Sequence, residues 1–139
     1  MNYSSIEQSK HLLKLGLSPE SADACYDVGD GQTKAHIECE NFTSYFTNDE
    51  FPELKDRYIP CWSVGALLEL MPSTLHTFLG NTHLCMYKAF DDTNIQGIKE
   101  EIYHLSYAGI YMTKDYKNII DACVEILEYL LQNNYIKTE

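Results

Sequence analysis

A cysteine followed by a tryptophan at the expected start of a helix is the arrangement in this sequence best suited to chemistry. Cys61 and Trp62 directly precede Ser63, a residue type that favours the N-cap position. A thiol near a helix N-terminus has a lowered pKa, because the helix dipole stabilises the thiolate, which is the nucleophilic form. The sequence therefore offers Cys61 as a candidate nucleophile.

His104 is the candidate base for a thiol hydrolase that uses Cys61. Papain-like peptidases place their nucleophile in a Cys-Trp pair, but the glycine-rich residues before it are absent here and too few residues follow to supply that family's distant histidine. NlpC-type thiol peptidases need a strand that begins with histidine, and Tyr107 occupies that place. Because His104 is three residues earlier, its side chain would point to the other sheet face. We expect Cys61 to be a buried thiol beside a core tryptophan and predict no catalytic residue. A thiol hydrolase remains an alternative.

Histidine and cysteine could also bind a metal. His36 and Cys39 are three residues apart, but no Cys-x-x-Cys or His-x-x-x-His pair is present. Four other residues could meet once the chain folds: His76, His83, Cys85 and His104. Scattered residues of these types are usually unliganded, so we predict no metal site and no cofactor.

Length and composition indicate one folded domain. The chain has 139 residues, of which 45% are hydrophobic and 22% charged, close to the average for soluble proteins. Its five cysteines are odd in number and widely spaced, which favours reduced thiols over a disulfide framework. No apolar run is long enough to cross a bilayer and no signal peptide is visible, so we expect a cytoplasmic protein without membrane contact.

The charge balance is strongly acidic. The net charge is −11, from 21 acidic against 10 basic residues, and this argues against direct binding to nucleic acid. Part of the excess lies between Asp27 and Asp56. We interpret this stretch as a solvated loop region. The alternative is an acidic surface that docks on a basic partner or mimics DNA, as a decoy of a DNA-binding host factor would.

Four segments are expected to be helical. Ser63 and Pro72 delimit a short helix at residues 64–71, which must be stabilised by packing because it has only about two turns. The other expected helices are residues 5–15, ended by Gly16, a short helix from Pro19 through Cys25, and residues 118–134 with Asn118 as N-cap.

Alternating or continuous apolar residues predict the strands. These are residues 34–39, 42–46, 83–90 and 102–111, the last two as antiparallel neighbours. We expect both faces of residues 83–90 to be covered. Residues 73–80 could be an extended segment that carries Leu75, Phe78 and Leu79 toward the core. Tyrosines on one face of residues 102–111 could form a contact surface, although a role in the core is the preferred interpretation.

These elements predict a single α+β domain. It would contain an antiparallel sheet of three to five strands with helices mainly on one face. An N-terminal helical unit would span about residues 4–26, the sheet and central helix about 33–111, and the C-terminal helix about 118–134.

Three separated stretches carry a resemblance to a protein group. They are residues 60–72 (PCWSVGALLELMP), residues 121–127 with 130–136 (DACVEIL and LLQNNYI), and residues 12–23 (LLKLGLSPESAD). Together they resemble a group of small uncharacterised proteins from phages, prophages and other mobile elements of gut bacteria. The resemblance supplies no activity, because the matching positions are those of a core and its helix caps.

The function expected from these observations is protein interaction. We expect a non-enzymatic accessory protein of a mobile element that acts through an unknown protein partner or by self-association. A decoy would gather carboxylates on one face, and an enzyme would hold His104 within hydrogen-bonding reach of Cys61. An interaction module would instead expose a contiguous apolar or tyrosine patch.

Overall fold

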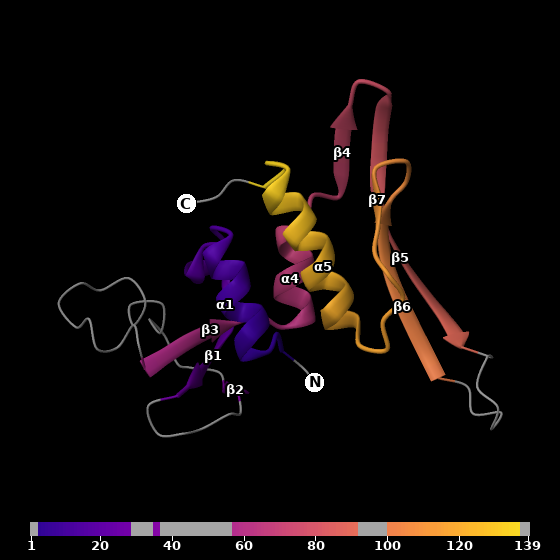
Figure 1. Ribbon diagram of the computed structural model, residues 1–139. Coiled ribbons are helices and arrows are strands. Elements are labelled where there is room, and N and C mark those ends of the chain that lie inside the picture. The colour runs from indigo at the N-terminus through magenta and orange to yellow at the C-terminus, as the bar shows by residue number, and fades with distance from the viewer. Residues whose placement is uncertain (1–2, 29–34, 37–56, 92–99, 137–139) are drawn as a thin grey trace.

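The protein places helices between two antiparallel β-sheets. The computed structural model describes residues 3–28, 35–36, 57–91 and 100–136. Within these ranges a three-stranded sheet and a four-stranded sheet lie on opposite sides of the helices (Figure 1). The expected α+β class with antiparallel strands is therefore confirmed, with the strands divided between two sheets rather than gathered in one.

The first helix, α1 (Ile6–Lys14), begins and ends at local signals. Ser5 accepts a hydrogen bond from the Gln8 amide, and the Gln8 side chain accepts one from the Ser5 amide. This reciprocal pair satisfies two amides that the helix itself cannot pair. After the helix, Gly16 has a φ of 101°, a left-handed conformation that is common just past a helix end and costs glycine little.

The other two α-helices of the described residues are also capped as the sequence predicts. α4 (Val64–Leu70) begins after Ser63, whose hydroxyl accepts a hydrogen bond from the third helical amide, and it ends just before Pro72. α5 (Ile119–Gln132) begins after Asn118, whose side chain accepts a hydrogen bond from the Ile120 amide. Both helices match the expected segments to within about two residues.

Residues 19–27 differ from the expected second helix. One 3₁₀ turn, η1 (Pro19–Ser21), follows Ser18 as N-cap, and a strand, β1 (Ala24–Asp27), follows soon after. The expected helix through Cys25 is therefore wrong. All four residues of β1 are buried between two neighbouring strands, and this pairing outweighs a weak local preference for helix.

β1 is the central strand of the smaller sheet. It pairs antiparallel with β2 (Ala35–His36) and with β3 (Tyr58–Cys61). Because β3 is an edge strand, it tolerates Pro60, which has no amide to donate. β2 falls within the expected strand 34–39, whereas the expected strand 42–46 and the acidic loop after it lie outside the described residues.

The larger sheet is a simple antiparallel meander. Its strands are β4 (Thr74–Thr77), β5 (Gly80–Asp91), β6 (Glu100–Tyr107) and β7 (Tyr111–Met112), in that order. β5 and β6 are antiparallel neighbours, as expected, with Met86 opposite Leu105. β5 is three times as long as β4, so most of its length extends beyond that neighbour.

The expected strand 102–111 is two strands rather than one. Gly109 has a φ of 78° in a tight turn, so the chain reverses after Tyr107 and β7 pairs back onto β6. A glycine inside a strand pattern often marks such a reversal, because it adopts left-handed backbone conformations without steric cost.

The main core lies between the helices and one face of the larger sheet. Leu105 and Tyr107 of β6 are fully buried against it, together with Leu67 of α4. α5 contributes the longest run of buried side chains: Ile120, Ala122, Cys123, Val124, Ile126, Leu127, Leu130 and Leu131. The apolar stripe predicted for this helix is therefore confirmed. Among the described residues, no helix covers the opposite face of the sheet (Figure 1).

Candidate functional site

Large apolar side chains are exposed over the larger sheet. Within the described residues, seven such side chains are exposed, and all but Tyr135 belong to this sheet or its first hairpin: Phe78, Leu79, Met86, Tyr87, Phe90 and Met112. Single exposed apolar residues are normal in proteins, but a group on one structural unit indicates a binding surface. We refer to these six residues, which lie at the tip of the β4–β5 hairpin and on both faces of the sheet, as the apolar surface.

The tip of the β4–β5 hairpin is the most exposed part of this surface. Phe78 is 96% exposed and Leu79 is 83% exposed, although the sequence pattern assigned both to the core. That expectation is wrong for these two residues and right for Leu75, which is buried. The hydroxyl of Thr77 accepts a hydrogen bond from the Leu79 amide and donates one to the Gly80 carbonyl, which fixes the turn. Figure 1 shows this hairpin projecting from the body of the protein.

The expectation that both faces of residues 83–90 are covered is also wrong. Met86, Tyr87 and Phe90 are each more than half exposed. Successive residues of a strand point to opposite faces, so Tyr87 lies on one face and the other two lie on the face that the helices cover elsewhere. Met86 and Phe90 are exposed because this part of β5 extends beyond α5 (Figure 1), and Tyr87 is exposed because it lies on the face away from the helices.

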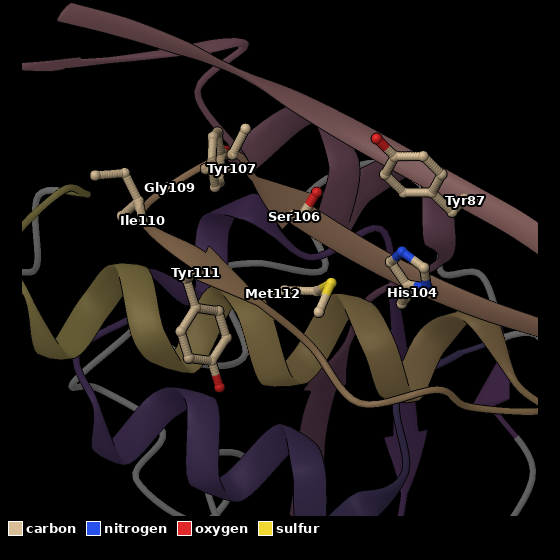
Figure 2. A pocket seen from close by; sticks show the side chains of 9 residues that line it. Tyr87, His104, Ser106, Tyr107, Gly109, Ile110, Tyr111 and Met112 are labelled. Carbon is tan, nitrogen blue, oxygen red and sulfur yellow. The ribbon is translucent and has the colours of Figure 1, made fainter.

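A hollow of about 470 Å³ lies on the face of the larger sheet away from the helices. Tyr87, His104 and Ser106 line it together with the turn that joins β6 to β7 (Figure 2). A second hollow, of about 110 Å³, lies between that turn and the tip of the β4–β5 hairpin. The two hollows share Ala108, Gly109 and Ile110, so a continuous uneven surface runs from Leu79 to Tyr87.

The polar groups of the larger hollow are held in a fixed orientation. Nδ1 of His104 lies 3.1 Å from Oδ1 of Asp115, and the His104 ring stacks on Tyr87 with centroids 4.6 Å apart. Ser106 is two residues further along the same face of β6, but the described structure contains no hydrogen bond between it and His104. A serine nucleophile would need that bond for activation. The geometry provides an oriented imidazole and an aromatic ring, which suits molecular recognition.

Cys61, the candidate nucleophile, is fully buried in the smaller sheet. It packs in a cluster with Ala24, Tyr26 and Ile59, while His104 belongs to the larger sheet. Burial raises the pKa of the Cys61 thiol to about 12, with smaller contributions from Cys25 and Asp23. The structure therefore does not bring Cys61 and His104 together, and the thiolate form is disfavoured at neutral pH.

Two histidines of the larger sheet form hydrogen bonds with side chains on the neighbouring strand. His76 hydrogen-bonds Asn81 and His83 hydrogen-bonds Thr74, each across the β4–β5 pair. No group of three or more metal-binding side chains occurs among residues that the structure describes. The four cysteines among the described residues are free thiols: Cys25, Cys61, Cys85 and Cys123.

Two features of the site were missed by sequence reasoning. Asp115, the partner of His104, lies eleven residues away along the chain, in the segment that returns beside β6 after β7. No local pattern connects the two residues. The exposure of Phe78 and Leu79 did have a signal, because they lie between Thr77 and Gly80, residue types that favour a turn.

The comparisons leave the site to be interpreted from its own geometry. None of the helices in the described ranges is long and apolar enough to cross a membrane. Comparison of the chain with models of protein families, with curated proteins and with solved structures finds no match.

Proposed function

We propose that this protein is a non-enzymatic interaction module that binds a protein partner through the apolar surface of its larger sheet. The observation that carries the proposal is the concentration of exposed large apolar side chains on this one unit. Burying such side chains drives most protein association, and aromatic residues and methionine are enriched at interfaces. The resemblance to small phage and prophage proteins supports a role as an accessory protein of a mobile element.

A site-specific photo-cross-linking experiment tests this function. A photoreactive amino acid is placed at Phe78 or Met112 on the apolar surface, and at Lys10 or Glu69 on exposed helix positions as controls. In cells that carry the gene, irradiation should give adducts of discrete mass from the first pair only. Equal adduct formation from the helix positions would contradict the proposal.

A matched variant links the adducts to the hairpin tip. Phe78→Ser combined with Leu79→Ser should abolish the Met112 adduct while the free energy of unfolding changes by no more than about 0.5 kcal/mol, because both side chains are exposed. A Met112 adduct that persists unchanged in this variant would show that the hairpin tip takes no part in binding.

A further inference from the structure

Within the described residues, the edge of β5 has no pairing strand beyond His83, which is over most of the strand's length. β4 pairs with β5 only as far as His83, and the Leu84 amide then donates a hydrogen bond to the Ser73 carbonyl at 2.9 Å. The residues before Ser73 belong to the segment that connects α4 to the sheet and do not run along β5. In the described part of the chain, no strand continues along this edge of β5.

The hydrogen bonds show which backbone groups face the open edge. Along a strand, the backbone N–H and C=O groups of successive residues point alternately toward its two neighbouring strands. Those of Leu84 point toward the β4 side, where its amide bonds to Ser73. The Thr113 amide donates a hydrogen bond to the Leu105 carbonyl at 2.9 Å, so the backbone groups of Leu105 point toward the β7 side. They therefore form no hydrogen bond with Met86, the residue opposite on β5. By this alternation, the amides and carbonyls of three β5 residues face the open edge: Met86, Lys88 and Phe90.

This edge is accessible from solvent. Met86 is 55% exposed and Phe90 is 54% exposed, and the Lys88 side chain is also more than half exposed. Figure 1 shows this end of the β5–β6 pair reaching past α5. An unpaired edge of five residues that is flanked by apolar side chains is a ready template for another strand.

A second copy of this chain is a poor occupant of the edge. Only one antiparallel register pairs all three open residues in both copies, and it places Lys88 directly opposite its counterpart, where like charges repel. Two chains of net charge −11 also repel each other at long range. The same charge attracts a basic partner and accelerates its association.

We propose that residues 86–90 of β5 bind an extended, basic segment of a partner protein as an added strand. Main-chain hydrogen bonds to Met86, Lys88 and Phe90 would supply affinity, and alternate side chains of the segment would contact Met86 and Phe90. The proposal rests on the proposed function, because it specifies how the interaction module binds its partner.

A pair of variants at Lys88 isolates the backbone contribution. Lys88→Pro removes the amide that faces the open edge, and proline is tolerated where an edge amide faces solvent. Lys88→Ala removes the same side chain, including its ion pair with Glu101, but keeps the amide. The probe is a displayed library of random nine-residue peptides, selected on the native protein. We expect the selection to enrich peptides with alternating apolar residues and a net positive charge. The affinity of these peptides for Lys88→Pro should be roughly ten-fold weaker than for Lys88→Ala.

Hydrogen exchange tests the same contact without any substitution. Addition of a selected peptide should slow amide exchange at Met86, Lys88 and Phe90, whereas the Tyr87 and Ala89 amides, which face β6, provide the internal control. Equal binding to the two Lys88 variants, unchanged exchange at the three amides, or a selection that enriches no peptide would overturn the proposal.

The outcomes separate this proposal from the proposed function. Photo-cross-links from Phe78 that persist in Lys88→Pro, with no protection of the edge amides, would leave the interaction module standing and refute strand addition. Sedimentation that detects a dimer in the native protein and in Lys88→Ala, but not in Lys88→Pro, would overturn the choice of a basic partner in favour of a second copy.

Discussion

Cys61 and Trp62 are adjacent, and burial decides the chemistry of both side chains. The helix that follows would lower the pKa of a nearby thiol, but burial has the larger effect and raises the pKa of Cys61 to about 12. The indole N–H of Trp62, equally buried, donates a hydrogen bond to the Ser21 hydroxyl at 2.9 Å. The Cys61 thiol therefore remains neutral in its buried position, and the Trp62 indole offsets the cost of burial with one hydrogen bond.

Thiol labelling should distinguish Cys61 from Cys85. Cys61 is fully buried and its pKa is about 12, whereas Cys85 is partly exposed. In the native protein we expect iodoacetamide to modify Cys85 between pH 7 and 9 and to modify Cys61 only after urea unfolds the chain. Peptide-resolved mass spectrometry measures both rates, with Cys85→Ser to assign the fast site. Fast native labelling of Cys61 would instead restore the thiol hydrolase as a candidate.

The indole hydrogen bond makes a second prediction at this scale. Ser21→Ala leaves the buried indole N–H of Trp62 without its partner and should lower the free energy of unfolding by about 1–3 kcal/mol. Ser21→Thr retains a hydroxyl and should be closer to the native protein. Urea denaturation followed by the fluorescence of the single tryptophan measures both variants. A native-like stability for Ser21→Ala would mean that another acceptor replaces Ser21.

At the scale of elements, the helices were predictable because their boundaries are local. Ser5, Ser63 and Asn118 each cap a helix through a side chain only two or three residues from its backbone partner. The strand β1 was not predictable in this way, because it is held by β3, more than thirty residues away. The division into two sheets has the same origin, since strand pairing is set by contacts that no short window contains.

The candidate site was predictable only in part for a related reason. His104 was correctly expected on the strand face opposite Tyr107, which is buried. Exposure depends on whether a helix covers a given strand, and α5 covers β6 at Leu105 but leaves Met86 of β5 more than half exposed. The preferred core role of the tyrosines holds for Tyr107, whereas Tyr87 belongs to the apolar surface.

Glu125 of α5 links the helix to the chain around β7. The hydroxyls of Tyr111 and Tyr116 donate hydrogen bonds to its two carboxylate oxygens at 2.8 and 2.7 Å. The pKa of each tyrosine is raised to about 12, chiefly by the Glu125 hydrogen bond for Tyr116 and chiefly by burial for Tyr111. The carboxylate therefore contributes unequally to the two shifts.

Glu125→Gln should separate these two contributions. We expect the pKa of Tyr116 to fall toward its ordinary value of 10 by more than that of Tyr111, because its largest cause is removed. NMR titration of the tyrosine rings measures both. Glu128→Gln is the matched control on the same helix, since Glu128 makes no hydrogen bond to either tyrosine, and it should leave Tyr116 unchanged. Equal changes in the two tyrosines would contradict this assignment.

At the scale of the whole molecule, one helical layer serves two sheets of different character. The smaller sheet is buried along β1, whereas the larger sheet is buried on the helix side and open on the other. The helices thus stabilise the larger sheet from one side, while its hairpin tip, its open face and the edge of β5 remain available. This asymmetry is what makes the larger sheet, rather than the cysteine of the smaller one, the candidate site.

Two buried thiols and a buried tyrosine predict that the protein loses stability in alkali. Burial raises the pKa of the Cys61 and Cys123 thiols from 9.0 to about 12, and that of Tyr107 from 10.0 to about 12. Above pH 9 the unfolded chain releases protons that the folded chain retains, so the free energy of unfolding falls as pH rises from 9 toward 12. Each thiol contributes a slope of about 1.4 kcal/mol per pH unit within that window and nothing below it.

Urea denaturation between pH 7 and 10.5 should therefore give constant stability up to about pH 8 and a decline above pH 9. Cys123→Ala should reduce the slope, and a flat profile to pH 10.5 would show that these groups ionise without unfolding.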